Sequence, residues 1–220
     1  MLSTIGEDIR RFAGQCCELM FNERDFQMQL ALFLNQTGHY DDVEVEYYIP
    51  NAIAKKADYE WDSNLKLDIV TKLADKYAVI ELKYPTRRVV CPILRFGKAI
   101  DNCEIMKNQG AQDLVSYNFW KDVRRIEVVK RLFPDTVVGG LAVMLTNDPY
   151  YVKGPSPGSL CEQFSTANNR KKIHGYLDWT RHTKTTIGHP GFKLYGNYSI
   201  LWNTYEIENN KFYQTLITVT

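Results

Sequence analysis

The sequence predicts a single α/β domain over residues 1–220, and three kinds of segment support this fold class. One segment has the apolar spacing of an amphipathic helix, three alternate as half-buried strands do, and one is a nearly continuous apolar run. Such a run suits a strand in a sheet that is covered on both faces. The chain is 45% hydrophobic, which is enough for one good core.

The N-terminal part of the chain is expected to be helical. Residues 1–21 predict a short helical lead-in, and "NERDFQMQLALFLNQTG" predicts a stronger helix over residues 23–36. The apolar residues of this second helix recur at helical spacing: Phe26, Leu30, Phe33 and Leu34. Asn22 can cap the start of the helix and Gly38 can end it.

Three strands are expected to follow, over residues 43–50, 65–72 and 77–84. Residues 85–102 are rich in Arg and Pro and predict a loop. A long helix is expected from about Asn102 to Leu132.

The apolar run 136–148 predicts the covered strand. Residues 148–220 begin with a polar stretch of about forty residues, a length at which loops are usually functional or disordered. Two further segments, "FKLYGNYSILWNTYEI" and "KFYQTLITV", predict a closing β-hairpin.

Composition narrows the class of protein. The net charge of +1 imposes neither a nucleic-acid nor a membrane partner. Without a signal peptide or a long apolar segment, we expect a cytoplasmic protein with no membrane partner. No Gly-rich phosphate loop is present, and we expect no organic cofactor. The cysteines form no CxxC pair, which argues against a zinc site: Cys16, Cys17, Cys91, Cys103 and Cys161.

Charged residues interrupt the two central strands in "KLDIVTKLADKYAVIELKY". If these strands form an antiparallel hairpin with Lys72 opposite Tyr77, then Asp68 lies opposite Glu81. Directly opposed side chains have Cβ atoms about 4.5–5.5 Å apart, so two carboxylates there repel unless a cation separates them or one is protonated. Lys83 shares a face with Glu81, because alternate residues of a strand point the same way.

Other interpretations of these residues stay open. Lys66 opposes Lys83 in the same register, so this face can instead be a solvated lattice in which each acid pairs diagonally with a lysine. Glu23 lies on or beside the apolar stripe of its helix, where a carboxylate is costly unless it has a partner. Alternatively, Glu23 merely favours the positively charged first turn of its helix.

These residues resemble the motif of the PD-(D/E)XK nuclease superfamily, which has the restriction-endonuclease-like fold. The match is "LKLDIV" followed by "VIELKY", with Asp68, Glu81 and Lys83 at the motif positions. The family core is a helix, three strands, a helix and a strand, in the order predicted above, around a mixed central sheet flanked by helices. The resemblance covers residues 22–147, which would form the nuclease-like core. Many members also carry an acid on the first helix, and Glu23 matches that position.

The resemblance implies a metal-dependent nuclease that hydrolyses DNA phosphodiester bonds. A divalent cation, Mg²⁺ or Mn²⁺, would bind Asp68, Glu81 and the backbone carbonyl of Leu82. Glu23 would hold a metal-bound water or a second ion. Lys83 would position the attacking water or help to deprotonate it, and would stabilise the phosphate in the transition state. Oxygen ligands of this kind are the ones that a hard divalent cation prefers.

A further resemblance lies in "NQGAQDLVSYNFWKDVRRIE". Some exonuclease-like members carry a QxxxY motif on this helix, but the spacing differs here. Gln109, Asp113 and Tyr117 follow at four-residue steps and would share a helix face. We predict that Gln109 contacts the active site or the substrate backbone, the alternative being an ordinary polar helix face. Gly110 can mark close packing of this helix against the sheet.

Basic residues near the motif are the predicted DNA contacts. Arg87 and Arg88 directly follow the lysine strand, and Lys55 and Lys56 lie in the loop before the hairpin. Further basic residues can also contact phosphates: Arg124, Arg125, Lys130, Arg131, Arg170, Lys171, Lys172, Arg181 and Lys184. Each of these clusters also resembles the ordinary surface of a soluble protein.

The favoured interpretation is therefore a Mg²⁺-dependent deoxyribonuclease whose partner is DNA. The alternative is a catalytically silent nuclease-like fold that binds nucleic acid or protein. A homodimer through the tyrosine-rich C-terminal hairpin is compatible with either interpretation.

Overall fold

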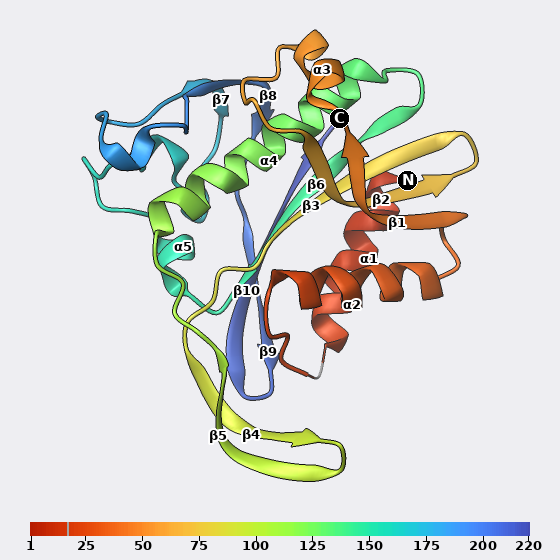
Figure 1. Ribbon diagram of the computed structural model, residues 1–220, viewed down its shortest axis with the longest axis vertical. Helices are drawn as coiled ribbons and strands as arrows, with labels where there is room; N and C mark the ends of the chain where they lie inside the picture. The colour runs from red at the N-terminus through yellow and green to blue at the C-terminus, as the bar shows by residue number, and fades with distance from the viewer. Residues whose placement is uncertain (17) are drawn as a thin grey trace.

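A computed structural model of the protein describes residues 1–16 and 18–220, so Cys17 lies outside the described residues. At its centre is a six-stranded sheet with the strand order β1-β2-β3-β6-β10-β9 (Figure 1). These strands are β1 (Asp42–Ile49), β2 (Leu65–Leu73), β3 (Lys76–Lys83), β6 (Val137–Thr146), β9 (Trp202–Ile207) and β10 (Asn210–Val219). β3 and β6 run parallel and the other neighbouring pairs run antiparallel. The predicted α/β class with a mixed central sheet is confirmed.

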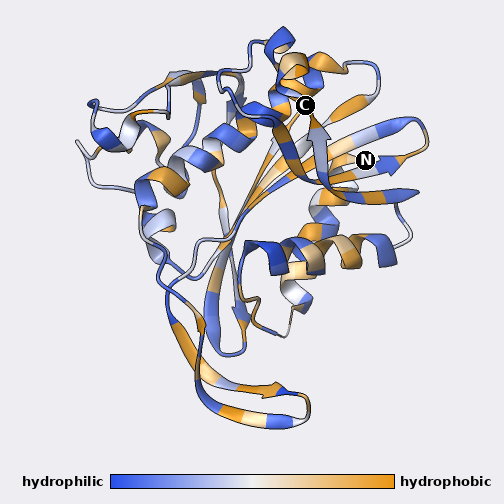
Figure 2. Ribbon diagram, viewed as in Figure 1, coloured by the Kyte–Doolittle hydropathy of each residue, from blue (hydrophilic) through white to orange (hydrophobic). Residues whose placement is uncertain are grey.

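Helices cover both faces of this sheet. α1 (Leu2–Gln15) and α2 (Glu23–Gln36) pack on one face, and α4 (Gln112–Leu132) packs on the other (Figure 1). β6 is buried along nearly its whole length, as its apolar run predicts. Apolar residues concentrate on the central strands (Figure 2). Among the described residues, no helix combines the length and apolar character needed to cross a membrane.

Local signals place α2 and the central hairpin. The Asn22 side chain accepts a hydrogen bond from the backbone N–H of Asp25 at 3.0 Å, so the predicted helix cap is confirmed. In the hairpin, Lys72 lies opposite Tyr77 as predicted. The connecting turn is shorter than expected, because β2 and β3 continue to Leu73 and Lys76.

The prediction for residues 85–111 is wrong. Instead of a loop and the first turns of a helix, most of this segment forms a two-stranded antiparallel arm, β4 (Val89–Arg95) and β5 (Lys98–Met106). The arm projects beyond the sheet at the end of the molecule opposite α3 (Figure 1). α4 begins only at Gln112. Two register shifts in the arm break the alternation that would have indicated strands.

The C-terminal part extends the sheet and covers α4. β9 and β10 form the predicted hairpin, and β10 pairs with β6 in the central sheet. The predicted hairpin segment also contains β8 (Phe192–Tyr198), which instead pairs with β7 (Ile173–Leu177). Short helical segments complete the chain: α3 (Asn51–Ala54), η1 (Lys55–Ala57), α5 (Pro149–Lys153), η2 (Glu162–Phe164) and η3 (Lys184–Thr186).

Gly140 allows α4 to approach the sheet closely. A Cβ at this position would lie 2.3 Å from the carbonyl oxygen of Val79 and 2.8 Å from Cγ2 of Ile126. We expect Gly140→Ala to lower the free energy of unfolding by about 3 kcal/mol through overpacking, as measured by urea denaturation.

Gly110 supplies the matched control. A Cβ there would meet no atom within 4 Å, so the prediction that Gly110 marks close packing is wrong. Gly110→Ala should change the free energy of unfolding by no more than about 0.5 kcal/mol. Equal losses in the two variants would contradict the assigned role of Gly140.

Candidate active site

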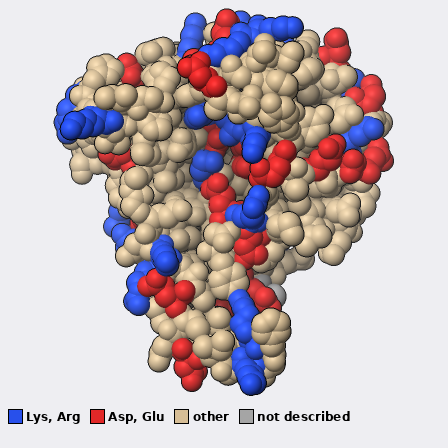
Figure 3. Space-filling view, viewed as in Figure 1, with Lys and Arg blue, Asp and Glu red and all other residues tan. Residues whose placement is uncertain are grey.

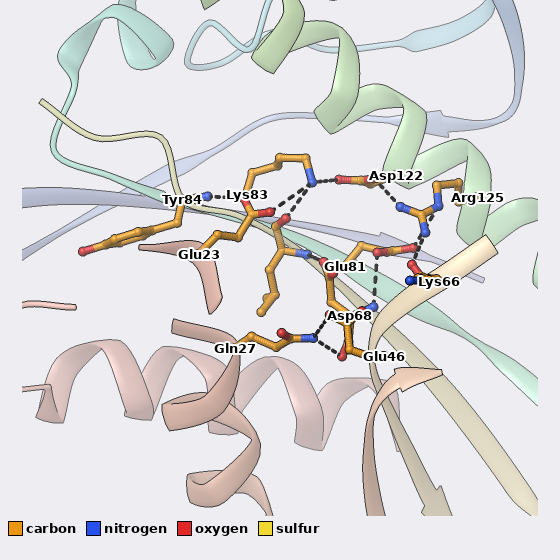
Figure 4. A network of polar contacts seen from close by, with 11 residues as sticks. Glu23, Gln27, Glu46, Lys66, Asp68, Glu81, Lys83, Tyr84, Asp122 and Arg125 are labelled. Carbon is orange, nitrogen blue, oxygen red and sulfur yellow. Dashed lines mark hydrogen bonds and ion pairs between the residues drawn. The ribbon is translucent and has the colours of Figure 1, made fainter. Parts of the chain in front are cut away.

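The charged residues of the central hairpin meet the start of α2 and the middle of α4 (Figure 4). β2 contributes Asp68, and β3 contributes Glu81 and Lys83. Glu23 is the first residue of α2. The sequence placed these four residues in three separate elements, and the structure brings them into one polar network.

Backbone groups hold Asp68 beside the β3 strand. The N–H of Leu82 donates to Asp68 Oδ2 at 2.6 Å, and the N–H of Asp68 donates to Glu81 Oε2 at 3.4 Å. Gln27 on α2 donates to the Asp68 carbonyl at 2.7 Å and to Glu46 Oε1 at 3.2 Å. The position of Asp68 is therefore fixed from both β3 and α2.

Glu81 is fully buried, which excludes the solvated lattice that the sequence left open. Its Oε1 lies 3.3 Å from Nε of Arg125 on α4. Arg125 also donates to the backbone carbonyl of Lys66. Lys66 thus takes part through its backbone, and the diagonal ion pair expected between Lys66 and Glu81 is not formed.

Lys83 connects the two sides of the network, and its side chain is only 16% exposed. Its Nζ lies 2.6 Å from Asp122 Oδ2 and 3.9 Å from Glu23 Oε1, and donates to the carbonyl of Leu82 at 2.8 Å. Asp122 in turn lies 3.2 Å from Arg125. A continuous chain of ion pairs therefore joins Glu23 at the surface to the buried Glu81.

Glu23 is anchored at the rim of this network. Its Oε2 accepts a hydrogen bond from the N–H of Tyr84 at 3.0 Å, and its side chain is 46% exposed. The interpretation that Glu23 merely favours its helix terminus does not account for its contacts with Lys83 and Tyr84. Glu23 thus meets Lys83 from the solvent side.

The network holds more negative than positive charge. Four carboxylates, those of Glu23, Asp68, Glu81 and Asp122, share two cations when all are ionised. Burial raises the pKa of Glu81 well above its ordinary value, although Arg125 opposes the shift. Burial likewise raises the pKa of Asp68, against the effect of Lys83. The site therefore favours uptake of positive charge.

The lysine responds in the opposite way to an isolated buried amine. Burial by itself lowers the pKa of Lys83. The carboxylates of Asp122 and Glu23 raise it by more than burial lowers it, so the pKa of Lys83 lies above its ordinary value. Lys83 therefore remains an ammonium ion at neutral pH.

A cleft of about 280 Å³ opens onto this network. It is lined by Glu23, Lys83, Pro85, Gln109, Val115, Asn118, Lys121, Asp122 and Arg125. Burial lowers the pKa of Lys121, which lies over the Trp61 ring at 4.7 Å. The cleft thus offers two amines and a guanidinium above the carboxylates.

Gln109 lines the cleft, but not from a helix. It precedes α4, and its N–H donates to the carbonyl of Thr86 at 2.9 Å. The predicted face shared with Asp113 and Tyr117 is therefore wrong. Tyr117 is fully buried and donates to the carbonyl of Pro190 instead.

The predicted DNA contacts differ in their surroundings. Arg87 and Arg88 lie at the root of the arm with side chains more than half exposed, and each pairs with an acid. Lys55 pairs with Asp62, and neither Lys55 nor Lys56 lines the cleft.

Two residues of the predicted basic cluster on α4 are unsuited to phosphate contact at the surface. Arg124 is fully buried and pairs with Glu60 at 2.9 Å, and Arg125 pairs with Glu81.

The sequence analysis did not identify Asp122 as a site residue. Asn118, Asp122 and Arg125 recur at helical spacing on one face of α4, which is the signal that could have found it.

The oxygen atoms of this network are of the kind that a hard divalent cation prefers as ligands. Asp68, Glu81 and the Leu82 carbonyl would supply oxygen ligands. The buried Glu81 Oε1 accepts no hydrogen bond, although Arg125 Nε lies 3.3 Å from it. Within the described residues, no group of three or more His, Cys, Asp or Glu side chains is arranged to hold a metal ion. A cation would instead bind two carboxylates, a carbonyl and water, in competition with Lys83 and Arg125.

Comparisons of the chain with protein-family models, with curated proteins and with solved structures gave no match.

Proposed function

We propose that this protein is a Mg²⁺- or Mn²⁺-dependent nuclease that hydrolyses DNA phosphodiester bonds. The observation that carries the proposal is the charge imbalance of the polar network around the motif residues: four carboxylates and two directly paired cations lie together at an open cleft. A divalent cation bound there would offset the mutual repulsion of these carboxylates and favour their ionised forms.

The order of elements supports a restriction-endonuclease-like fold. α2, β1, β2, β3, α4 and β6 follow one another as a helix, three strands, a helix and a strand. Asp68 and Glu81 lie on adjacent strands, and Lys83 follows two residues after Glu81. This arrangement matches the order and spacing of the PD-(D/E)XK motif.

Each residue takes a role that follows from its surroundings. Asp68, Glu81 and the Leu82 carbonyl would hold the cation, with Glu23 at the rim for a bound water. Bound there, the cation would supply Lewis-acid stabilisation of the charged phosphate. Lys83 would orient the attacking water and stabilise negative charge on the phosphate. The neighbouring carboxylates favour the ammonium form of Lys83, which suits the second of these roles.

The direct test is incubation of the purified protein with supercoiled plasmid and linear duplex DNA, with Mg²⁺, with Mn²⁺, or with EDTA. We expect cleavage with either metal and none with EDTA. The absence of cleavage under all metal conditions, on both substrates, would contradict the proposal.

One observation favours the alternative function, a nuclease-like fold that binds nucleic acid or protein without cleaving DNA. Glu81 and Asp122 already have protein cations as partners, so the site can be neutralised in part without metal. A silent fold would bind DNA with equal affinity in Mg²⁺ and in EDTA and leave it intact.

A further inference from the structure

We infer that the β4–β5 arm is a DNA-binding element that lies in a groove of the duplex beside the cleft and places Phe96 against the bases. The choice of DNA as ligand rests on the proposed function. The structural argument rests on the arm's tip, its charge and its attachment to the cleft.

Phe96, at the tip of the arm, is a residue that does not stabilise the fold. Phe96 and Gly97 form the two-residue turn between the paired Arg95 and Lys98. Both turn residues have positive φ, 51° and 76°, a combination for which Asn-Gly is preferred. Phe96 is fully exposed and therefore contributes nothing to the core. The strained backbone at Phe96 points to a functional role, and Leu94 and Ile100 add further exposed apolar side chains to the same arm.

The arm concentrates positive charge. Residues 85–108 contain two acids and five basic residues, giving a net charge of +3 in a chain whose total is +1. The acids are Asp101 and Glu104, and the basic residues are Arg87, Arg88, Arg95, Lys98 and Lys107. Figure 3 shows Lys and Arg atoms in a stripe at the end of the molecule that the arm forms, with Asp and Glu atoms also exposed there. This charge complements a phosphate backbone.

The basic residues at the tip are available to a ligand. In the part of the chain that the structure describes, neither Arg95 nor Lys98 forms an ion pair with an acid. The Arg95 guanidinium lies over the Phe21 ring at 4.7 Å, which holds the tip beside the segment that precedes α2. Phe96 is thus flanked by two cations in a defined position.

The root of the arm is part of the cleft. The chain leaves β3 directly after Lys83 and returns through Gln109, whose N–H donates to the carbonyl of Thr86. The Thr86 hydroxyl donates to the carbonyl of Lys107 at 2.9 Å, which ties the two sides of the root together. A phosphate beside Lys83 would therefore lie at the foot of the arm.

The dimensions of the arm suit a duplex. A two-stranded ribbon fits the major groove, which is about 12 Å wide. The seven residues of β4 span roughly 23 Å, the length of about seven base pairs. β-ribbons also bind in the minor groove. Proteins that bind there insert apolar side chains between base steps.

The test measures binding and stability together. Fluorescence anisotropy with a labelled 30-base-pair duplex in EDTA measures affinity without cleavage. We expect Phe96→Asn to lower the affinity by about fivefold or more, as the loss of base stacking does. Because Asn suits the turn, the thermal midpoint should stay equal or rise. Tyr48→Asn, which removes an exposed aromatic side chain from β1, should change the affinity by less than about twofold.

The charged residues give a second variant. Arg95→Ala with Lys98→Ala should weaken binding and reduce the slope of log affinity against log salt by about two. Wild-type affinity in both this double variant and Phe96→Asn would overturn the inference. So would Phe96-dependent dimers on sizing chromatography with unchanged DNA affinity, since the arm would then be a contact between copies of the chain.

The outcomes separate the two proposals. If the wild-type protein cleaves DNA and the arm variants bind as well as it does, the arm inference fails and the nuclease proposal stands. If Phe96→Asn weakens binding but no metal supports cleavage, the arm inference stands and the nuclease proposal fails. If the wild-type protein neither binds nor cleaves DNA, both fail.

Discussion

Lys83→Met is expected to lower the rate of Mg²⁺-dependent DNA cleavage by about a thousandfold or more. Methionine keeps the apolar stem of the side chain and removes the ammonium group that would face the phosphate. Gel-based cleavage kinetics measure the loss, and circular dichroism checks the fold. Lys76→Met is the matched control, because Lys76 begins the same strand at the end away from the cleft and should leave the rate within about twofold of wild type.

Removal of Lys83 also deprives Asp122 of its closest cation, at 2.6 Å. If Lys83→Met proves unstable, the double variant Lys83→Met with Asp122→Asn removes both charges together and keeps the test valid. Cleavage near the wild-type rate in either folded variant would show that Lys83 has no catalytic role.

Asp68→Asn is expected to abolish metal-dependent cleavage while stabilising the metal-free protein. The gain follows from the raised pKa of Asp68, which is caused mainly by burial and shows that its ionised form is unfavourable in the fold. Asparagine retains an oxygen that can accept the hydrogen bond from Leu82. Thermal unfolding in EDTA should show a midpoint above that of the wild-type protein.

Asp62→Asn provides the control for this substitution, because Asp62 is fully exposed and should leave the unfolding midpoint nearly unchanged. A large loss of stability in metal-free Asp68→Asn would instead mark Asp68 as a member of a structural ion-pair network. Retention of metal-dependent cleavage would remove Asp68 from the proposed cation site.

The same shifts predict a pH dependence of stability. Glu23, Asp68 and Glu81 have pKa values raised above 4.5, 3.8 and 4.5, so the folded state binds their protons more tightly than the unfolded state does. The stability that these groups contribute is fully present below their ordinary pKa values. It is lost as the pH rises through their raised pKa values in the folded protein. Without metal, the thermal midpoint should therefore fall from pH 4.5 towards pH 7, and less so in Asp68→Asn. An identical pH profile in both proteins would contradict this assignment.

Short-range sequence patterns were sufficient to predict much of the core. The apolar spacing of α2 and its Asn22 cap, the alternation of β1 to β3 and the apolar run of β6 each reflect the period of one element. The hairpin register is equally local, because a tight turn specifies which residues of β2 and β3 face each other. The arm was missed because Pro92 and two register shifts interrupt the strand pattern.

The sequence by itself determined that Asp68, Glu81 and Lys83 would lie together, since adjacent strands of one hairpin carry them. Only the tertiary structure decided their partners. Asp122 and Arg125 reach the site because α4 packs across β3 and β6, where Gly140 permits close approach. Contacts between elements far apart in the chain depend on how whole faces pack, and no short-range period in the sequence encodes that choice.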